Sequence, residues 1–381
     1  MPERRNIAVI GATGSVGGAV LDVCSRLKEH FKVWALAGNS NIEGLHFLGA
    51  SFQSDVLVLA DPVAAATLTQ KVSGRFSCYG GIEGLNAIIE DPRCDEVVFA
   101  SSGTGTLPAL VKALKSGRKV YLANKEILVA AGDWIMPMAR NGIIPLDSEH
   151  NAVWQCMKCE KPDRVKNIFL TASGGPFLDT PLEDLEKVTF EQAARHPVWP
   201  MGKKISVDSA TLMNKGIEMI EARHLFSLPP ERIKAVIHPQ ALVHGFVEFV
   251  DGSVKMLFSK PDMRLAVLSA LGFPERFDNP WDFLAPPDFS ELIVQFRIPD
   301  EEKFPCLAIA KEASILGGAY PPLLIGADEG AVSLFMEGKI GFLEIAKKVE
   351  RVLSSYRGGA PTSWEEALSL VDFARSTAFT I

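Results

Sequence analysis

The sequence has no excess of basic residues, no long apolar run and few cysteines, and each of these absences excludes a class of protein. Its 39 lysines and arginines are outnumbered by 46 aspartates and glutamates, for a formal net charge of −7, whereas nucleic-acid binding normally needs a basic face. No apolar stretch approaches the roughly 20 residues that span a bilayer. We therefore expect no nucleic-acid or membrane partner, and any bound phosphate must be held by local geometry.

The chain also lacks an apolar signal segment before its first strand-like run, which begins at Asn6, so we expect a cytoplasmic protein with reduced thiols. Its six cysteines are scattered over 381 residues. Cys156 and Cys159 form one C-x-x-C pair; we interpret them as small buried hydrophobic residues, with a metal or redox site as the alternative. The length and the 47% hydrophobic content allow two or three domains, each with its own core.

From Asn6 to about Leu122, short β-branched runs alternate with helix-length amphipathic stretches. This rhythm is typical of parallel strands joined by crossover helices. The clearest strands are expected at residues 7–10, 33–37, 56–59, 97–100 and 120–122. Each is followed closely by Gly, Ser, Asn or Asp, and ligands of such sheets bind at these carboxyl ends.

The pattern changes after about residue 143. Strands are expected at 168–171 and 243–249, the prolines of 274–299 predict an extended linker, and periodic runs at 331–336 and 342–353 predict helices. The predicted fold class is α/β. It comprises an N-terminal Rossmann-like dinucleotide-binding domain (1–146), a central α+β catalytic domain (147–275), a linker (276–303) and a C-terminal helical domain (304–381).

A glycine-rich turn follows the first expected strand. Gly11, Gly14 and Gly17 form a G-x-x-G-x-x-G run that leads into a helix expected from residue 18 to residue 27. Glycines at this junction permit a tight turn and let backbone N–H groups reach a pyrophosphate at the helix N-terminus. The placement indicates a dinucleotide site, with a glycine-rich structural turn as the alternative.

The end of the second expected strand indicates which dinucleotide is bound. NAD-specific folds usually place an acid there to bind the ribose 2′-hydroxyl, but residues 37–41 read Ala-Gly-Asn-Ser-Asn. Small polar donors tolerate a 2′-phosphate, so the segment favours NADPH over NADH. The alternative is a solvated loop.

Two carboxylates, Asp147 and Glu149, follow the strand-like run from Ile143 to Leu146. If the extended geometry continues, residues two apart point the same way. Carboxylates so close repel each other unless a cation lies between them, and oxygen ligands suit Mg²⁺ or Mn²⁺. The alternative is a helix start, where acids interact favourably with the helix dipole.

A second polar patch runs from a strand end at Thr171 into Ser173, Gly174 and Gly175. Such a turn exposes backbone N–H groups and a hydroxyl, which together can bind an anion. The alternative is an ordinary turn.

The third patch is the run 208–218. Ser209 stands where a helix N-cap is expected, and Asn214 and Lys215 lie four and three residues before Glu218. If the run is one helix, its start offers a hydroxyl, an amide, an ammonium and a carboxylate toward one region. The alternative is a surface pair of Lys215 and Glu218.

Between the second and third patches, residues 195–204 include His196, Trp199 and Met201 together with two prolines and a glycine. Such a loop is costly to leave in water, so we expect it to be a flap that closes over a ligand. The alternative is permanent packing of Trp199 in the core.

These patches belong to a longer series of motifs: G-A-T-G-S-V-G at 11–17, A-N-K-E at 123–126, D-S-E-H-N-A at 147–152, S-G-G-P-F at 173–177, H-P-V-W-P-M-G at 196–202, the run 205–226, H-P-Q at 238–240, F-P-C-L-A at 304–308 and G-G at 317–318. Over essentially its whole length the chain thereby resembles the 1-deoxy-D-xylulose 5-phosphate reductoisomerase family. It departs from the family pattern at Ser40, where Asn is common but donors remain on both sides at Asn39 and Asn41. It also departs at 324–329, where L-N-A-A-N-E is replaced by L-I-G-A-D-E.

The resemblance implies an activity: rearrangement of 1-deoxy-D-xylulose 5-phosphate and its reduction by NADPH to 2-C-methyl-D-erythritol 4-phosphate, in non-mevalonate isoprenoid biosynthesis. A divalent metal (Mg²⁺, Mn²⁺ or Co²⁺) would stabilise negative charge on the substrate's oxygens. The resemblance also implies a homodimer. The molecule that the protein binds as its substrate would be a small phosphorylated sugar.

The resemblance also assigns residues by position. The metal ligands would be Asp147, Glu149 and Glu218, and the catalytic groups Lys125, Glu149 and His196. Substrate would be bound by Lys125, Ser148, Glu149, Ser173, His196, Trp199, Ser209, Asn214, Lys215 and Glu218. NADPH would be bound by Thr13, Gly14, Ser15, Val16, Gly38, Asn39, Ser40, Asn124, Glu126 and Gly202.

Two other functions share some of these features. A semialdehyde or sugar dehydrogenase could have a similar dinucleotide domain, but the phosphorylating semialdehyde type needs a nucleophilic cysteine, and no cysteine here has a convincing catalytic context. A nucleotide-sensing regulator could keep the fold without chemistry, but would not need three carboxylates.

Overall fold

The computed structural model describes residues 4–72, 74–198, 202–290 and 292–381. The chain divides into two compact units. The first unit comprises Met1–Ile127, Ile135–Asn151 and Asp262–Ala285, and the second Leu128–Trp134, Ala152–Pro261 and Pro286–Ile381. The finer division into domains at residues 146, 275 and 303 remains a prediction.

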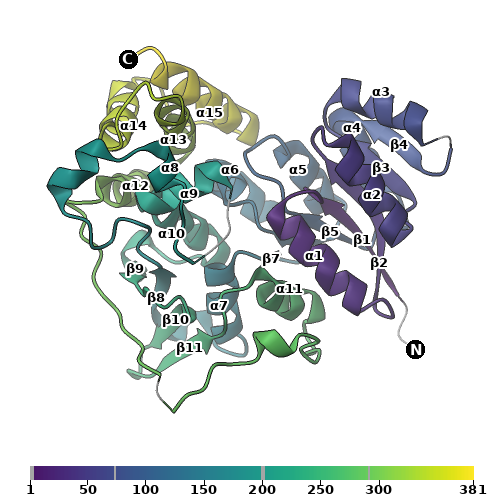
Figure 1. Cartoon of the computed structure of the whole chain (residues 1–381), viewed down its shortest axis with the longest axis horizontal. Helices are drawn as coiled ribbons and strands as arrows, with labels where there is room; N and C mark the ends of the chain where they lie inside the picture. The colour runs from purple at the N-terminus through teal and green to yellow at the C-terminus, as the bar shows by residue number, and fades with distance from the viewer. Residues whose placement is uncertain (1–3, 73, 199–201, 291) are drawn as a thin grey trace. The chain divides into compact units, whose positions relative to one another are not determined.

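A parallel sheet organises the first unit (Figure 1). Among the described residues its strand order is β4-β3-β2-β1-β5-β6-β7, and every neighbouring pair is parallel. The direction of strand addition reverses between β1 and β5, and in open α/β sheets ligands bind at this switch point. The strands are β1 (Arg5–Ile10), β2 (Phe31–Gly38), β3 (Val56–Leu59), β4 (Ser77–Gly80), β5 (Glu96–Phe99), β6 (Lys119–Leu122) and β7 (Ile143–Pro145).

The five strands predicted for this region are confirmed, and their burial explains why they were recognisable. Ile7, Val9, Leu57 and Leu59 are fully buried, as expected for a parallel sheet covered on both faces. Strand β4 was not predicted because its residues, Ser77–Gly80, alternate between exposed and half-buried positions and lack a β-branched run.

Helices connect these strands, and one helix returns from far along the sequence. Helix α11 packs against α1, with Arg264 Nη1 3.1 Å from Asp22 Oδ2. The helices are α1 (Ser15–Arg26), α2 (Ile42–Phe52), α3 (Pro62–Lys71), α4 (Gly81–Glu90), α5 (Leu107–Lys115) and α11 (Met263–Gly272); α6 (Lys125–Ile135) and α7 (Ser148–Cys156) each have residues in both units.

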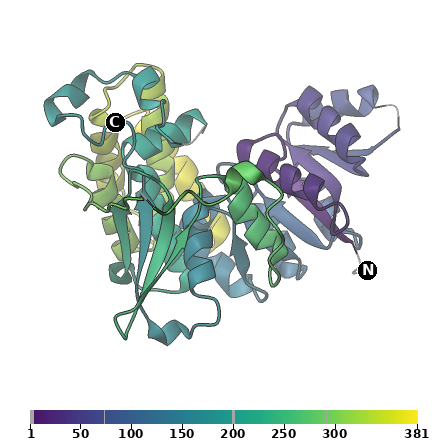
Figure 2. The same cartoon turned by 60° about the horizontal axis from the view of Figure 1, so that its bottom comes forward.

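A mixed sheet organises the second unit; Figure 2 shows its strands side by side. Its order is β11-β10-β8-β9, with β8 parallel to β9 and antiparallel to β10, and β10 antiparallel to β11. The strands predicted at 168–171 and 243–249 are confirmed. The four strands are β8 (Val165–Ala172), β9 (Ile233–Ile237), β10 (Val243–Phe249) and β11 (Val254–Phe258).

Helix α10 links this sheet to the C-terminal helices. It packs against β8 and β9 and also against α12. The contact with α12 needs a glycine, because a β-carbon on Gly216 would lie 2.3 Å from the Ala310 β-carbon. The helices of this unit are α8 (Phe190–Ala193), α9 (Lys203–Ala210), α10 (Met213–Phe226), α12 (Pro305–Leu316), α13 (Tyr320–Met336), α14 (Glu344–Ser355) and α15 (Trp364–Ala378).

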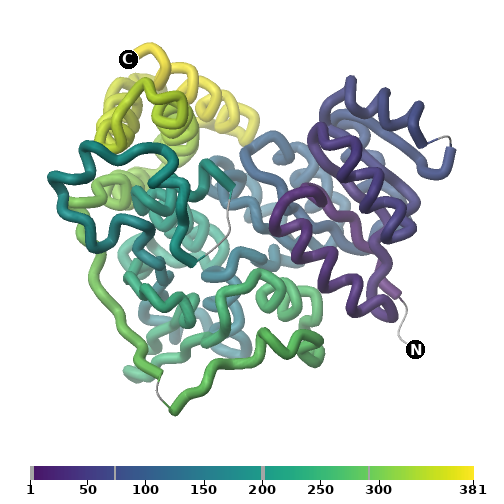
Figure 3. The backbone as a smooth tube through the Cα atoms, in the orientation of Figure 1, coloured from purple at the N-terminus to yellow at the C-terminus, as the bar shows by residue number. Residues whose placement is uncertain are grey.

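The extended linker predicted at 274–299 is confirmed only in part. Asp282–Leu284 form a short 3-10 helix in which Leu284 is buried, whereas the linker has no helix or strand over residues 286–290 and 292–296 (Figure 3). It is attached to the end of β9 by a bridge between Ile237 and Arg297. His238, from the H-P-Q motif, adds a second attachment: Leu242 N–H donates to its Nε2 at 3.1 Å, so Nδ1 carries the proton and donates to the Gln295 carbonyl at 2.8 Å. Within the described part of the chain, no helix is both long and apolar enough to cross a membrane.

Candidate active site

The glycine-rich turn between β1 and α1 forms a cradle that side chains would fill. Gly11 has a φ of +89°, and a β-carbon there would lie 2.5 Å from the Ala100 carbonyl carbon after β5. A β-carbon on Gly17 would lie 2.3 Å from the Gly11 oxygen. Among the described residues, no side chain caps the start of α1 at Gly14, so backbone N–H groups remain for an anion. The predicted cofactor residues Thr13, Gly14, Ser15 and Val16 all lie in this turn and are exposed or half-buried.

The segment after β2 offers small polar groups and no acid. Asn39 and Ser40 are exposed, and Gly38 is half-buried. Asn41, which the sequence suggested as a second donor beside Ser40, is the N-cap of α2: its Oδ1 accepts the Gly44 N–H at 2.9 Å. Asn39 and Ser40 are therefore the polar side chains here that are not used in capping α2.

Asn124 connects two strand ends of the first unit. Its fully buried amide donates to the Gly103 carbonyl at 2.7 Å, and its Oδ1 accepts the Ile127 N–H at 3.3 Å at the start of α6. The end of β6 is thereby tied to the loop after β5. Ser101 and Gly103 of that loop were not among the predicted site residues, although Ser and Gly directly after a buried strand are the same signal that marked the other strand ends.

Lys125 and Asp147 meet at the ends of neighbouring strands β6 and β7. Lys125 Nζ lies 3.1 Å from Asp147 Oδ2, and both side chains are largely buried. Of the two alternatives for Asp147 and Glu149, extended geometry or a helix start, the structure has the helix start, because α7 begins at Ser148. A serine followed by an acid favours a helix start. Ser148 Oγ donates to Glu149 Oε2 at 2.5 Å within that first turn.

In the second unit, Ser173 and His196 form a hydrogen-bonded pair. Burial lowers the pKa of His196 to about 4, so its ring is neutral at neutral pH. Val198 N–H donates to Nδ1 at 3.2 Å, which assigns the proton to Nε2 and makes Nε2 the donor to Ser173 Oγ at 3.0 Å. Ser173 Oγ also accepts the Gly175 N–H at 3.3 Å. The hydroxyl therefore accepts two hydrogen bonds and retains its own proton for an anion.

The Ser173 turn packs directly on the end of α9. Gly175 has a φ of +69°, and a β-carbon there would lie 2.8 Å from the Ser209 carbonyl oxygen, so the turn can approach α9 this closely only with glycine. Ser209 was predicted to be a helix N-cap, but this prediction was wrong, because Ser209 lies in the last turn of α9. The run 208–218 is two helices because Leu212 adopts a left-handed conformation (φ 60°) between α9 and α10.

Asn214, Lys215 and Glu218 lie in the first turns of α10. Asn214 Nδ2 donates to Glu218 Oε1 at 2.5 Å, and Lys215 Nζ pairs with Glu218 Oε2. Lys215 and Glu218 are 3% and 1% exposed, so the alternative of a surface ion pair was wrong. Each of these buried side chains neutralises the charge of the other, and removing either one would leave an unpaired buried charge, which is strongly unfavourable.

The predicted flap is described in part. Gly202 is the exposed N-cap of α9, and His196 is placed as above. Trp199 and Met201 lie outside the described residues. Glu126, the remaining predicted cofactor contact, is half-buried in the first turn of α6.

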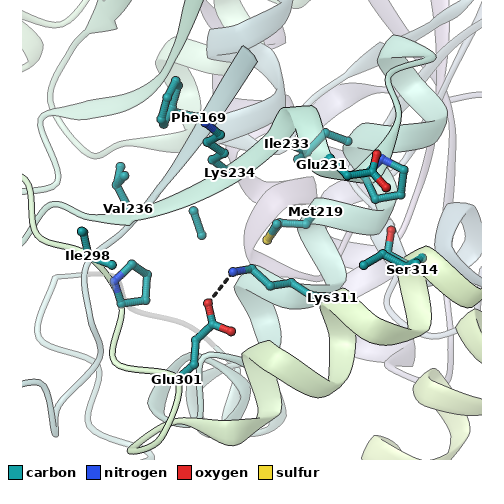
Figure 4. Close-up of a pocket in the computed structure, with 14 residues that line it drawn as sticks. Phe169, Met219, Glu231, Ile233, Lys234, Val236, Ile298, Glu301, Lys311 and Ser314 are labelled. Carbon is teal, nitrogen blue, oxygen red and sulfur yellow. Dashed lines mark hydrogen bonds and ion pairs between the residues drawn. The ribbon is translucent and has the colours of Figure 1, made fainter. Parts of the chain in front are cut away.

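Helix α10 also borders a hollow that contains none of the predicted site residues. Met219, the residue after Glu218, lines a hollow of about 540 Å³ with Phe169, residues 233–236 of β9 and residues of α12 (Figure 4). Lys311 forms an ion pair with Glu301 at its edge. The hollow is a feature separate from the predicted anion site.

The C-x-x-C pair has no evident catalytic role. Cys156 is buried, and burial raises the pKa of its thiol to about 11, so it is a small buried hydrophobic residue as interpreted. The same interpretation was wrong for Cys159, which is exposed. Cys159 follows the end of α7 with a φ of 65°.

A glycine-rich turn at the switch point of a parallel α/β unit is typical of dinucleotide-binding enzymes. The buried lysine–carboxylate pair at adjacent strand ends and the anion-type turn of the second unit add groups that can bind a polar, phosphorylated substrate. Three family models match the chain: 1-deoxy-D-xylulose 5-phosphate reductoisomerase over residues 7–132, and two models of its C-terminal domain over 143–226 and 258–377. The chain belongs to the 1-deoxy-D-xylulose 5-phosphate reductoisomerase family.

Individual relatives agree with this assignment. The reductoisomerase of Acidithiobacillus ferrooxidans is 43% identical and covers 99% of this chain and 97% of the relative. That of Zymomonas mobilis is 40% identical, with 99% and 98% covered. Among solved structures, the Zymomonas mobilis enzyme in complex with NADPH has a TM-score of 0.91 at 38% identity, covering 99% of this chain and 98% of the other. A reductoisomerase in complex with NADPH, fosmidomycin and magnesium has a TM-score of 0.91 at 36% identity, with 98% and 97% covered.

Proposed function

We propose that this chain converts 1-deoxy-D-xylulose 5-phosphate, NADPH and a proton to 2-C-methyl-D-erythritol 4-phosphate and NADP⁺, using a divalent metal ion. The observation that carries the proposal is that relatives with this activity align with 99% of the chain. The reaction belongs to the non-mevalonate route of isoprenoid biosynthesis.

The first unit fits NADPH. The cradle at Gly11 and Gly17 admits a backbone approach that any side chain would block, and Asn39 and Ser40 follow β2 where NAD-specific folds place an acid. The solved relatives bind NADPH. Its contacts are proposed at Thr13, Gly14, Ser15, Val16, Gly38, Asn39, Ser40, Asn124, Glu126 and Gly202.

The proposed metal ligands are Asp147, Glu149 and Glu218. Carboxylate oxygens are the ligands that Mg²⁺ and Mn²⁺ prefer, and magnesium is present in solved relatives. When bound, the ion would stabilise negative charge on the substrate's oxygens. Lys125 is held beside Asp147 and Lys215 beside Glu218, so each of these two carboxylates has a cation that balances its charge.

The phosphate end of the substrate would bind in the second unit. Ser173 retains a hydroxyl proton to donate, its turn packs on Ser209, and Lys215 supplies positive charge. Asn214 completes the set, with Trp199 and His196 from the predicted flap. Fosmidomycin, present in a solved relative, would occupy the same place.

Proton movements are assigned to Lys125 and Glu149, with Ser148 contacting the substrate beside them. Lys125 is buried and paired, so it can orient a substrate oxygen and return a proton to it. His196, neutral at neutral pH, orients the Ser173 hydroxyl through its Nε2–H and completes the proposed catalytic set with Lys125 and Glu149.

One assay tests the proposal. NADPH absorbance is followed after addition of 1-deoxy-D-xylulose 5-phosphate, with Mn²⁺ and with a chelator. We expect oxidation that requires both the sugar phosphate and the metal, with 2-C-methyl-D-erythritol 4-phosphate identified by mass spectrometry. NADPH oxidation without the rearranged product would instead indicate a simple sugar dehydrogenase.

A homodimer is proposed from the outer surface of the second unit. Strand β11 is a sheet edge, and Val254 and Met256 on it are each 47% exposed. The linker adds Phe289, which is 63% exposed and packs against Phe258 of β11. An open edge strand with apolar neighbours favours pairing with another chain, and a twofold copy is the simplest closed arrangement.

The cytoplasm is the proposed location. Burial raises the pKa of the Cys24 and Cys94 thiols to about 12, so these cysteines behave as protonated hydrophobic core residues. They need no oxidising compartment, and NADPH as reductant is consistent with that location.

A further inference from the structure

Lys204, the second residue of α9, contacts two carboxylates in the second unit. Its Nζ lies 2.6 Å from Asp208 Oδ2 one turn later, and it also pairs with Asp328 Oδ2 of helix α13. Asp328 is fully buried and the Asp208 side chain is 5% exposed, whereas that of Lys204 is 32% exposed. The cation therefore reaches inward from the surface to two buried anions.

Local helix energetics do not explain this lysine. A cation in the first turn opposes the helix dipole, and a lysine four residues before an acid is the less favourable order of a helix pair. By contrast, the fully buried carboxylate of Asp328 would be strongly destabilising without a cation beside it, because an unpaired buried charge is unfavourable. The tertiary contact to α13 thus accounts for Lys204.

The contact fixes a very short helix. Helix α9 has 8 residues, or about two turns. It starts at Lys203, after the N-cap Gly202, and carries Ser209 directly after Asp208. Lys204 and Asp208 lie on one face of α9, and the Lys204 ammonium joins the Asp208 carboxylate to Asp328 of α13. The rotation of α9 about its axis is therefore set by α13, and so is the position of Ser209 against the Ser173 turn.

We propose that Lys204, Asp208 and Asp328 form a positioning cluster that orients α9 so that Ser209 can bind the substrate's phosphate end. This role rests on the proposed function of Ser209. None of the three residues needs to touch the substrate; they act through the helix.

The test uses inorganic phosphate as a probe of the anion site, with affinity measured by calorimetry on the full chain. Asp328→Asn keeps the shape and removes the charge, and Lys204→Met removes the cation. We expect each to weaken phosphate binding about tenfold and to raise the KM for 1-deoxy-D-xylulose 5-phosphate similarly, with kcat changed much less. Lys204→Arg, which keeps the charge, should restore most of the affinity.

The matched control is Glu301→Gln, which breaks the Lys311–Glu301 ion pair of the same unit away from α9 (Figure 4). It should leave phosphate affinity unchanged. The double variant Lys204→Met/Asp328→Asn should bind phosphate no worse than either single variant, because both remove the same contact.

Wild-type phosphate affinity in Asp328→Asn, or a loss equal to that of Glu301→Gln, would overturn the positioning role. So would a variant that only unfolds more easily while binding phosphate normally. These results are distinct from failure of the proposed function, which would appear as wild-type protein that does not oxidise NADPH on addition of the sugar phosphate.

Discussion

Gly17 lies so close to Gly11 that a β-carbon on Gly17 would come within 2.3 Å of the Gly11 carbonyl oxygen, whereas its neighbour Gly18 faces open space. The first turn of α1 thus packs on the end of β1 through one glycine and not the next. Gly17 is therefore needed for the cofactor cradle, whereas Gly18 is an ordinary helix residue.

The change Gly17→Ala should therefore destabilise the protein by about 1–3 kcal/mol, as overpacking does, and weaken NADPH binding. Gly18→Ala is the matched control and should stabilise by about 0.4–1 kcal/mol through reduced unfolded-state entropy. Denaturant unfolding and NADPH fluorescence titration check both. Equal effects of the two changes would contradict the cradle.

Cofactor preference should depend on Asn39. Wild type should prefer NADPH over NADH at equal concentrations. Asn39→Asp introduces a carboxylate near the proposed 2′-phosphate, and we expect the KM for NADPH to rise about tenfold, equivalent to ~1.4 kcal/mol, with little change for NADH. Asn41→Asp, which keeps the cap of α2, controls for net charge; a matching effect there would remove Asn39 from the site.

Glu218→Gln tests the proposed metal ligand. Loss of its charge should lower turnover by roughly a hundredfold or more, the scale of a lost electrostatic stabiliser, and excess Mn²⁺ should recover only part of it. NADPH binding should remain close to wild type. The loss of charge balance for buried Lys215 also predicts reduced stability, so circular dichroism accompanies the Mn²⁺ titration.

Glu248→Gln is a close control, because Glu248 also accepts hydrogen bonds from a lysine and an asparagine, Lys166 and Asn167, but on strand β10. Its Mn²⁺ dependence should match wild type. If Glu218→Gln gave the same activity curve as Glu248→Gln, Glu218 would not be a metal ligand.

Stability should fall with acid through buried histidines. Burial lowers the pKa of His244 to about 4 from 6.5, so the unfolded chain binds this proton more readily than the folded chain. The contribution that neutral His244 makes to the free energy of unfolding is fully present above about pH 6.5 and is lost as the pH falls toward 4. At pH 5 this loss is on the order of 2 kcal/mol for one such group. Urea unfolding of wild type and His244→Gln at pH 7.5 and pH 5 checks this prediction. The free energy of unfolding should fall less for the variant than for wild type between pH 7.5 and pH 5. An equal loss in both would show that His244 does not contribute.

The dimer should depend on the surface at β11. Phe289→Asp places a charge on a 63% exposed apolar position that packs against Phe258 of β11 and should shift the protein toward monomer in sedimentation velocity. Val63→Asp, at a 76% exposed apolar position of α3, should not. A wild-type monomer at micromolar concentration would contradict the homodimer.

Local chemistry made much of this protein readable from its sequence. The β-branched runs of β1, β2 and β3 predicted parallel strands because their burial on both faces demands continuous apolar residues, and Gly11 to Gly17 marked the cradle because the close approach tolerates no side chain. The ordered motifs from Gly11 to Gly318 identified the family. Each of these signals lies within a few neighbouring residues.

Tertiary structure decided what depends on residues far apart in the chain. The break between α9 and α10 follows from Leu212 in a left-handed conformation, which the helix-like spacing of Ser209, Asn214 and Glu218 did not reveal. Likewise, burial alone distinguishes the Lys215–Glu218 pair from a surface pair of the same spacing. Asp328 lies 124 residues from Lys204, and because charge pairing acts through space, only the packing of α13 beside α9 shows that they meet.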